Sequence, residues 1–134
     1  MDDIFVASLM SPDVVTVTPN TLVEEAAEQL REREIDSLVV VDHYGRIEGI
    51  LTSTDFVEIV ARSQPKAETT VERYMTDQVV TVGPQDSLRE AADTMITYGI
   101  RHLPVVDNDD EVVGMLSSTD LTAYLSGAQE PSPA

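Results

Sequence analysis

Residues 10–60 read MSPDVVTVTPNTLVEEAAEQLREREIDSLVVVDHYGRIEGILTSTDFVEIV, and residues 75–125 repeat the pattern as MTDQVVTVGPQDSLREAADTMITYGIRHLPVVDNDDEVVGMLSSTDLTAYL. The two stretches align without a gap at a shift of 65 residues, and 19 of the 51 aligned positions are identical. Unrelated sequences of this length would share about three. The chain is therefore an internal duplication. About 55 residues form only a marginal core alone, so we expect the two copies to pack together and complete one core.

Within each copy, the apolar pattern predicts the order strand, helix, strand, strand, helix, which is an α+β fold built from two βαββα repeats. Each copy starts with a short apolar stretch, at 4–10 and at 71–75, which is expected to form one helical turn. The predicted strands lie at 14–17, 38–41 and 47–51, with counterparts at 79–82, 103–106 and 112–116. The predicted helices cover 23–30 and 88–95, then run from 53 or 54 to 60 and from 118 or 119 to 125.

The ends of these elements carry recognisable signals. Thr21 with Glu24, and Ser87 with Glu90, have the spacing of capping boxes at the start of the first helix of each copy. The residues between the last two strands of each copy are turn formers, which indicates hairpins. We therefore expect repeat 1 at 6–60, a surface linker at 61–70, repeat 2 at 71–125 and a disordered tail at 126–134.

The composition limits the class of protein. The chain has 134 residues and no cysteine, so disulfides and thiolate chemistry are excluded. Its apolar stretches are far shorter than the roughly 20 residues that span a bilayer, and its start lacks a signal-peptide pattern. These features favour a cytoplasmic protein with no membrane partner.

The formal net charge is −17, from 25 acidic residues against eight lysines and arginines. Such a surface repels phosphate backbones, so we expect no nucleic-acid partner. With 42% hydrophobic residues in clear periodic patterns, the charge does not indicate disorder. It is typical of a hydrated acidic surface and would suit a high-salt cytoplasm, in which salt should stabilise the fold by screening.

The motif that could bind a ligand is Gly-x-x-[Ser/Thr]-Ser-Thr-Asp, which occurs at 49–55 and 114–120. A strand there enters the N-terminus of a helix, where free N–H groups attract anions. The hydroxyls of Thr52 and Ser117 add donors, and the carboxylates of Asp55 and Asp120 could accept hydrogen bonds from a vicinal diol such as ribose. The same spacing also fits a capping box that serves only the helix. The residues alone leave both interpretations open.

Arg101 and His102 precede the middle strand of copy two and concentrate hydrogen-bond donors in an acidic chain, while copy one has Asp36 and Ser37 there. Such a pair is either surface decoration or part of a ligand site at the end of a strand. The four tyrosines, Tyr44, Tyr74, Tyr98 and Tyr124, are expected to be partly buried packing residues. His43 and His102 occupy different contexts, so no metal site is expected, and no set of nucleophile, base and orienting group indicates an enzyme.

Three motifs occur in order in the chain, and all resemble one family. Pro-x-x-x-[Val/Leu]-x-Glu-Ala-Ala, then Leu-Pro-Val-Val-Asp, then Val-Gly-Met-Leu-[Ser/Thr]-x-x-Asp are similar to the cystathionine β-synthase (CBS) domain, here as a stand-alone tandem pair, or Bateman module. The resemblance covers both copies, from about Val6 to Leu125. It implies two repeats packed through their sheets with pseudo-two-fold symmetry, with two clefts between them, and often a disc-like homodimer.

The resemblance also implies a ligand. Members of the family typically bind AMP, ADP, ATP or S-adenosylmethionine, with the Asp of the motif on the ribose hydroxyls and its Ser/Thr near phosphate or ribose. These roles fall on Asp55 with Thr52 and on Asp120 with Ser117, and capping becomes the secondary role. Basic residues before Leu-Pro-Val-Val-Asp often reach phosphates in the family, and this role falls on Arg101 and His102. By the pseudo-symmetry of the repeats, these two residues should face the cleft that contains Asp55. Asp36 would repel a polyphosphate, so the Asp120 site should be the weaker nucleotide site or should prefer a less anionic ligand.

The function that follows is that of a regulatory sensor. We expect it to bind an adenosine ligand, to require no cofactor, and to modulate an unknown protein partner or its own assembly. The alternative is a ligand-free scaffold dimer, which no adenosine compound would stabilise against heat. A metal-responsive or DNA-responsive regulator is disfavoured by the missing metal spacing and by the charge.

Overall fold

The structure is a computed structural model that describes residues 4–61, 69–127 and 131. It divides into two compact units, which we call the continuous unit, Val15–Val79, and the split unit, Met1–Val14 with Val80–Ala134. Much of the predicted linker, at 62–68, lies outside the described residues, as does most of the predicted tail, at 128–130 and 132–134. Among the described helices, none combines the length and apolar character that crossing a membrane requires.

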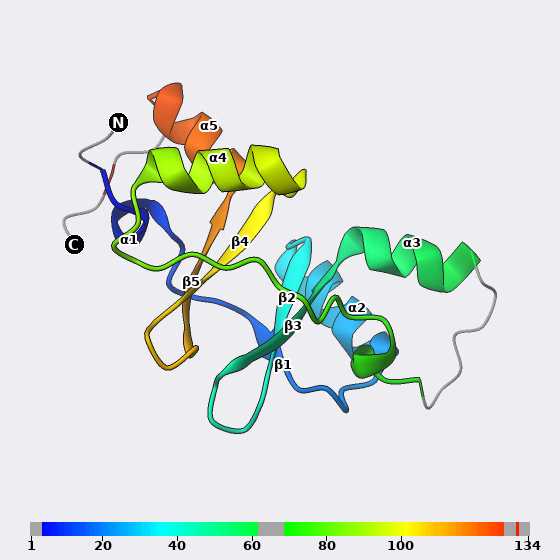
Figure 1. Cartoon of the computed structure of the whole chain (residues 1–134). Coiled ribbons are helices and arrows are strands. Elements are labelled where there is room, and N and C mark those ends of the chain that lie inside the picture. Colours follow the sequence, from blue (N-terminus) through cyan, green and yellow to red (C-terminus); the bar gives the residue numbers. More distant parts are fainter. Residues whose placement is uncertain (1–3, 62–68, 128–130, 132–134) are drawn as a thin grey trace. The chain divides into compact units, whose positions relative to one another are not determined.

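The continuous unit contains a three-stranded sheet in the order β1-β2-β3 (Figure 1). Strand β1 runs parallel to β2, and β2 forms an antiparallel hairpin with β3, with Ser37 opposite Thr52 at one end and Val41 opposite Ile47 at the other. A buried cluster that includes Leu38, Val40 and Leu51 joins the sheet to its helices. The elements are β1 (Thr16–Val17), α2 (Val23–Arg33), β2 (Ser37–Val41), β3 (Ile47–Thr52), α3 (Ser53–Ala61) and the 3₁₀ turn η1 (Val71–Arg73).

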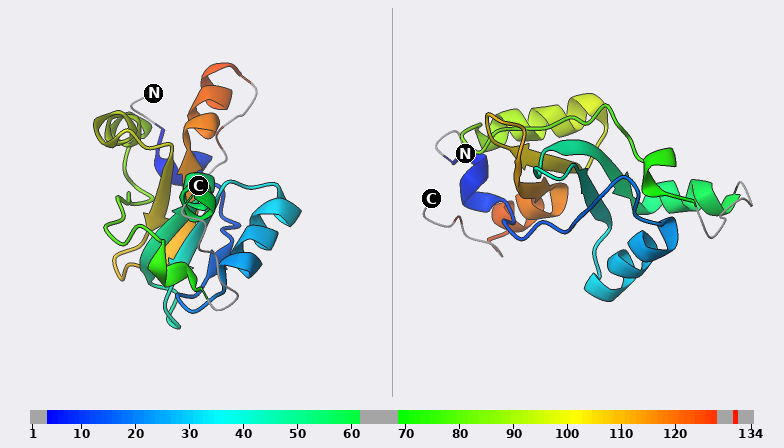
Figure 2. Two further views of the ribbon diagram at one scale, coloured as in Figure 1. Left: turned by 90° about the vertical axis from the view of Figure 1, so that its right-hand side faces the viewer. Right: turned by 90° about the horizontal axis from the view of Figure 1, so that it is seen from below.

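The split unit contains a two-stranded antiparallel hairpin, β4 with β5, beside helices α4 and α5 (Figure 2). Its core includes Leu88 and Met95 of α4, Leu103 and Leu116 of the hairpin and Leu121 of α5. The elements are α1 (Val6–Leu9), α4 (Leu88–Tyr98), β4 (His102–Val106), β5 (Val112–Ser117) and α5 (Ser118–Leu125). The predicted α+β class, with helices and a hairpin in each repeat, is confirmed.

The short segment that begins each repeat packs in the unit of the other repeat. Met10 lies on Gly114, and the neighbouring Ser11 forms an isolated bridge with Met115 of β5. In the same way, Met75 lies on Gly49, where an added Cβ would be only 2.6 Å from the methionine Sδ, and Thr76 bridges Ile50 of β3. Each hairpin therefore needs a glycine to let the sulfur of the other repeat's first segment approach.

The strand predicted at 79–82 does not form, because only Val82 bridges to β4, at Val105. In the continuous unit, the Val39 N–H donates to the Val15 carbonyl at 3.3 Å. The position equivalent to Val39 is Pro104, which has no N–H to donate, so the second repeat cannot extend this pairing.

Two other predictions were wrong. Thr21 does not cap α2: the residue before the helix is Leu22, without a side-chain cap, and the Thr21 hydroxyl instead accepts a hydrogen bond from the Thr18 N–H at 3.1 Å. By contrast, the Ser87 hydroxyl accepts the Glu90 N–H at 3.1 Å, which confirms the cap of α4. Tyr44 and Tyr98 are not packing residues, since they are 63% and 62% exposed.

Candidate functional site

The first candidate position lies where β3 passes directly into α3. The Thr52 N–H donates to Asp55 Oδ2 at 2.8 Å, and the Thr52 hydroxyl lies 3.4 Å from the same oxygen. The Ser53 N–H donates to the Asp36 carbonyl at 3.0 Å, which ties the start of α3 to the residue before β2. The helix start, the Thr52 hydroxyl and the Asp55 carboxylate are thus held together by short local bonds.

The second candidate position, where β5 enters α5, forms a complete capping box. The Ser117 N–H donates to Asp120 Oδ2 at 2.8 Å, and the Asp120 N–H donates to the Ser117 hydroxyl at 3.2 Å. The equivalent return bond, from the Asp55 N–H to the Thr52 hydroxyl, is absent among the described residues. The capping interpretation is therefore confirmed in full for α5 and in half for α3.

Capping uses only part of each carboxylate. Both Asp55 and Asp120 bond locally through Oδ2, and no donor among the described residues reaches Oδ1. An ionised carboxylate can accept about four hydrogen bonds, so each aspartate keeps acceptor capacity beyond its structural bond. A cap and a ligand contact are compatible at the same residue.

The partly buried position of Asp55 changes the pKa of its carboxyl. Burial raises the pKa of the Asp55 carboxyl, and the nearby Glu58 charge raises it further, while the two hydrogen bonds from Thr52 lower it. The net direction is upward. Burial that disfavours the charged form also strengthens any hydrogen bond that a ligand hydroxyl donates there, because less water competes.

Arg101 and His102 lie at the start of the other hairpin. His102 is the first residue of β4, and the Arg101 carbonyl accepts the N–H of Ser118, the first residue of α5, at 2.9 Å. Within the split unit, Arg101 is therefore next to the Ser117 and Asp120 motif. The exposed guanidinium of Arg101 makes no hydrogen bond or ion pair with the part of the chain that the structure describes.

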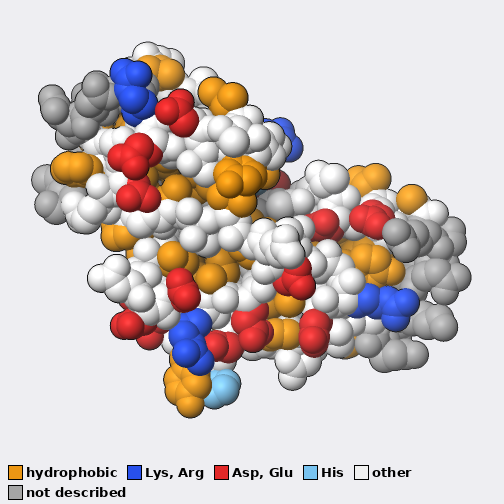
Figure 3. Space-filling view, viewed as in Figure 1, with side chains coloured by type: hydrophobic (Ala, Val, Ile, Leu, Met, Phe, Trp, Pro, Cys, Tyr) orange, Lys and Arg blue, Asp and Glu red, His pale blue; other side chains and the backbone are white. Residues whose placement is uncertain are grey.

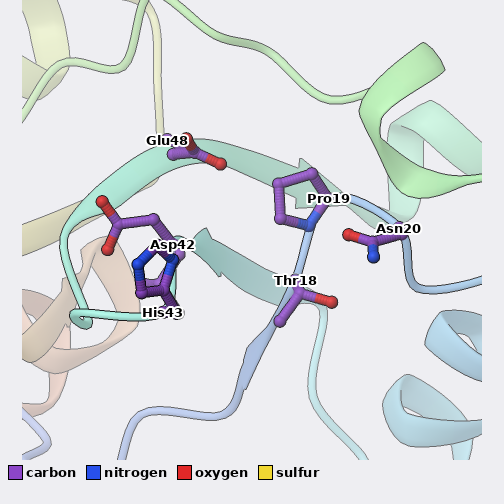
Figure 4. A pocket seen from close by; sticks show the side chains of 7 residues that line it. Thr18, Pro19, Asn20, Asp42, His43 and Glu48 are labelled. Carbon is purple, nitrogen blue, oxygen red and sulfur yellow. The ribbon is translucent and has the colours of Figure 1, made fainter.

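The structure also contains a pocket that the sequence patterns did not indicate. It has a volume of about 450 Å³ and lies at the end of β2 and β3 opposite to Asp55. Figure 4 shows Asp42 and His43 on one side, Thr18, Pro19 and Asn20 on the other, and Glu48 between them. These polar side chains could bind the hydroxyl or amino groups of a small molecule. Its lining residues are Thr18, Pro19, Asn20, Val41, Asp42, His43 and Glu48.

This pocket was missed because three separated stretches build it. The only sequence signal is Glu48, an acidic residue in a strand whose counterpart in the second repeat is Val113. Metal binding has no support within the described ranges, where no group of three histidine or acidic side chains is placed to hold an ion. His43 in the β2–β3 turn and His102 at the start of β4 belong to different units.

Comparisons with known proteins match both copies of the repeat to one family. The family model described as the CBS domain matches residues 6–62 and again 71–127. An uncharacterised 17.7 kDa protein of Acidianus ambivalens is 35% identical over 120 residues, which cover 90% of this chain and 72% of the relative. A homoserine O-acetyltransferase of Methanohalobium evestigatum is 32% identical over 121 residues, and there the match covers 90% of this chain but only 24% of the enzyme.

A solved structure agrees with the fold. The CBS domain pair of protein MJ0100, in complex with 5′-methylthioadenosine and S-adenosyl-L-methionine, superposes with a TM-score of 0.85 at 31% identity. The match covers 93% of this chain and 98% of that one. The similarity to the acetyltransferase is confined to about a quarter of that enzyme.

Proposed function

The chain belongs to the CBS domain family, and we propose that it is a regulatory module that binds an adenosine-type ligand: AMP, ADP, ATP or S-adenosylmethionine. The observation that carries the proposal is the paired arrangement of a helix start, a hydroxyl and a half-used carboxylate, at Thr52 with Asp55 and at Ser117 with Asp120. The related pair of MJ0100 holds two adenosine compounds, which supports this ligand class.

Each aspartate is proposed to accept hydrogen bonds from the ribose hydroxyls through the oxygen that the cap leaves unused. Hydrogen bonds to a charged acceptor contribute about 1.5 to 3 kcal/mol each when they are shielded from water. Both aspartates are partly buried, so a hydrogen bond from a ligand would be partly shielded from water at either position.

Arg101 and His102 are proposed to bind the phosphates of the ligand that Asp55 holds. Arginine favours phosphate because its planar guanidinium donates two parallel hydrogen bonds. The bond between the Arg101 carbonyl and the Ser118 N–H makes Asp120 the competing assignment. In copy one, Asp36 occupies the position of Arg101, so this copy supplies an acidic residue where a phosphate would need a cation.

Isothermal titration with AMP, ATP and S-adenosylmethionine tests the ligand class. For the compound that binds, Asp55→Ala should weaken binding by about tenfold to a hundredfold, since one or two hydrogen bonds to a charge are lost. Ser87→Ala is the matched control, because it removes a helix cap of the same kind at α4, outside the proposed sites. It should leave binding unchanged. Equal weakening in both variants would show that only stability is being measured.

The partner of Arg101 is tested by a double-mutant cycle. Arg101→Ala should weaken ATP binding much more than S-adenosylmethionine binding, because only ATP has phosphates. Arg101→Ala is then combined with Asp55→Ala or with Asp120→Ala. The losses of ATP-binding free energy should be non-additive only for the aspartate that binds the same ligand as Arg101. Coupling to Asp120 alone would overturn the assignment of Arg101 to the Asp55 ligand.

A scaffold without ligand is the second candidate function. The exposed apolar side chains of Val57 and Val60 on α3 favour contact with another protein surface. We propose that this surface belongs to a second copy, in a homodimer. A ligand at 100 times its dissociation constant adds about 2.7 kcal/mol to stability, so melting curves with each compound separate the two functions. No catalytic role is proposed, and the output is proposed to pass to a partner protein, in the cytoplasm, or to the module's own assembly.

A further inference from the structure

The turn between β2 and β3 and the turn between β4 and β5 share one backbone frame. In the first, the Asp42 N–H donates to the Arg46 carbonyl at 2.9 Å, and Asp42 Oδ1 accepts the N–H groups of Tyr44 and Arg46 at 2.8 and 3.0 Å. In the second, the Asp107 N–H donates to the Glu111 carbonyl at 3.0 Å, and Asp107 Oδ1 accepts the corresponding N–H groups of Asp109 and Glu111.

The left-handed residue also falls at the same place, Gly45 with φ 81° and Asp110 with φ 61°. An identical frame means that the side chains at equivalent positions leave the backbone alike. We call residues 42–46 the Tyr–Arg turn and residues 107–111 the acidic turn.

The two turns carry opposite chemistry on that frame. Where the Tyr–Arg turn has Tyr44, Gly45 and Arg46, the acidic turn has Asp109, Asp110 and Glu111. Asp42 and Asp107 are the same residue, and all four positions after them differ between the two turns. Arg46 and Glu111, which are equivalent, have opposite charge.

The Tyr–Arg turn is exposed and fixed in position. The Arg46 guanidinium carbon lies 5.0 Å from the centre of the Tyr44 ring, and Arg46 Nε bonds to Asp42 Oδ2 at 3.1 Å. The His43 ring lies 4.2 Å from that of Tyr44. Tyr44 is 63% exposed and the Arg46 side chain 51% exposed. Figure 3 shows basic, hydrophobic and histidine side chains gathered in a projection at the lower edge, where Figure 1 shows the turn between β2 and β3.

Such a group has the properties of a docking element. Tyrosine and arginine dominate the energetic centres of protein interfaces. Because Asp42 and Tyr44 already hold the arginine, little side-chain freedom remains to be lost on binding. The Arg46 Nη groups bond to nothing in the described part of the chain, so they can donate to a carboxylate from outside.

We propose that the Tyr–Arg turn of one copy docks on the acidic turn of a second copy. Two copies, each with net charge −17, repel one another over most of their surfaces. Charges beyond about 10 Å are screened at 0.1 M salt, so a contact is favourable where opposite charges meet directly. The Tyr–Arg turn offers a cation, and the acidic turn offers the exposed carboxylates of Asp109, Asp110 and Glu111.

The contact joins two different surfaces, so it can close into a small assembly or extend into a chain of copies. It is a second means of association, separate from the apolar face of α3. Since it is electrostatic, it should weaken as salt is raised.

Charge reversal tests the proposal by sedimentation equilibrium at about 0.1 M salt, where the repulsion between distant charges is screened. Arg46→Glu and Glu111→Arg should each raise the dissociation constant of self-association about tenfold or more, because each places like charges together. The double variant R46E/E111R should restore association, and a mixture of the two single variants should associate although neither does alone. Asp42 and Asp107 are untouched, so the frame of each turn is kept.

The two charge reversals also separate the proposed contact from the effect of net charge, because they change the net charge in opposite directions. R46E has net charge −19 and E111R has −15. If only overall repulsion mattered, E111R would associate more strongly than the wild type, whereas the proposed contact makes it weaker. Arg33→Glu and Glu32→Arg, at exposed positions of α2, change the net charge by the same amounts and should not reproduce the loss.

Several results would overturn the proposal. These are a wild-type chain that stays monomeric up to its solubility limit at about 0.1 M salt, equal average masses in solution for the wild type and all variants, and a double variant that does not recover association. If the chain dimerised only through another surface, the wild type and all the variants would have the same average mass in solution.

Discussion

Replacing Ser117 by Ala should lower the free energy of unfolding, while replacing Thr52 by Ala should lower it much less. The Ser117 hydroxyl accepts the Asp120 N–H at 3.2 Å, and alanine leaves that N–H in the first turn of α5 without its acceptor. The other half of the capping box uses the backbone N–H of residue 117 and survives the change. Loss of one serine cap costs about 1 kcal/mol, within a range of about 0.5 to 2.

Thr52 is the internal comparison, because it occupies the equivalent position before α3. Its hydroxyl has no bond from the Asp55 N–H in the described structure and only a 3.4 Å contact with Asp55 Oδ2. We therefore expect Thr52→Ala to cost less than about 0.5 kcal/mol, mainly from strand propensity. Ser117→Thr keeps a hydroxyl acceptor and should stay close to the wild type.

Urea unfolding followed by circular dichroism measures the difference, since the chain contains no tryptophan. The midpoint should fall for S117A with an unchanged slope. Hydrogen exchange of the α5 amides should accelerate in S117A and not in T52A, which locates the effect. Equal losses in the two variants, or a larger loss in T52A, would refute the interpretation that α5 depends on its cap more than α3 does.

Three further predictions follow from local geometry. Gly49→Ala places a methyl group 2.6 Å from Met75 Sδ and 3.0 Å from the Thr76 carbonyl, so it should destabilise the continuous unit by about 1 to 3 kcal/mol in urea unfolding. Ser87→Ala should cost about 1 kcal/mol at α4, whereas Thr21→Ala should spare α2, because Thr21 is not its cap. Because the pKa of Asp55 is raised in the folded state, the wild type should lose stability as pH rises from the unfolded pKa of 3.8 through the higher folded pKa. Asp55→Asn lacks this titration, so urea unfolding over that pH range should show the variant gaining stability relative to the wild type.

The hairpins and second helices were predictable because their signals are local. Short runs rich in apolar and β-branched residues at 38–41 and 47–51, separated by turn formers, define β2 and β3 closely. The failures have two causes, one non-local and one local. Whether residues 79–82 form a strand is decided by Pro104, twenty-two residues away, through a missing N–H. The Thr21 cap failed because Thr21 aligns with Asp86 and Leu22 with Ser87, so the two proposed boxes were not equivalent.

The site was predictable in part. The Ser/Thr and Asp spacing correctly indicated local bonding at both helix starts, since those partners are three residues apart. The pocket near Glu48 was not predictable, because it joins a loop after β1 to a hairpin more than twenty residues later. The residues proposed for ligand binding remain predictions that the titrations described above will decide.

The exchange of first segments between the repeats has a consequence for biosynthesis. The continuous unit is complete once residue 79 has left the ribosome, so it can fold while the rest of the chain is being made. Residues 4–14 must wait for β5, about 100 residues later, which at 5 to 20 residues per second is about 5 to 20 s. During that interval, the apolar side chains of Val6 and Leu9 lack the β4–β5 hairpin on which they pack. The split unit is thus closed last, when residues 4–14 meet the β4–β5 hairpin.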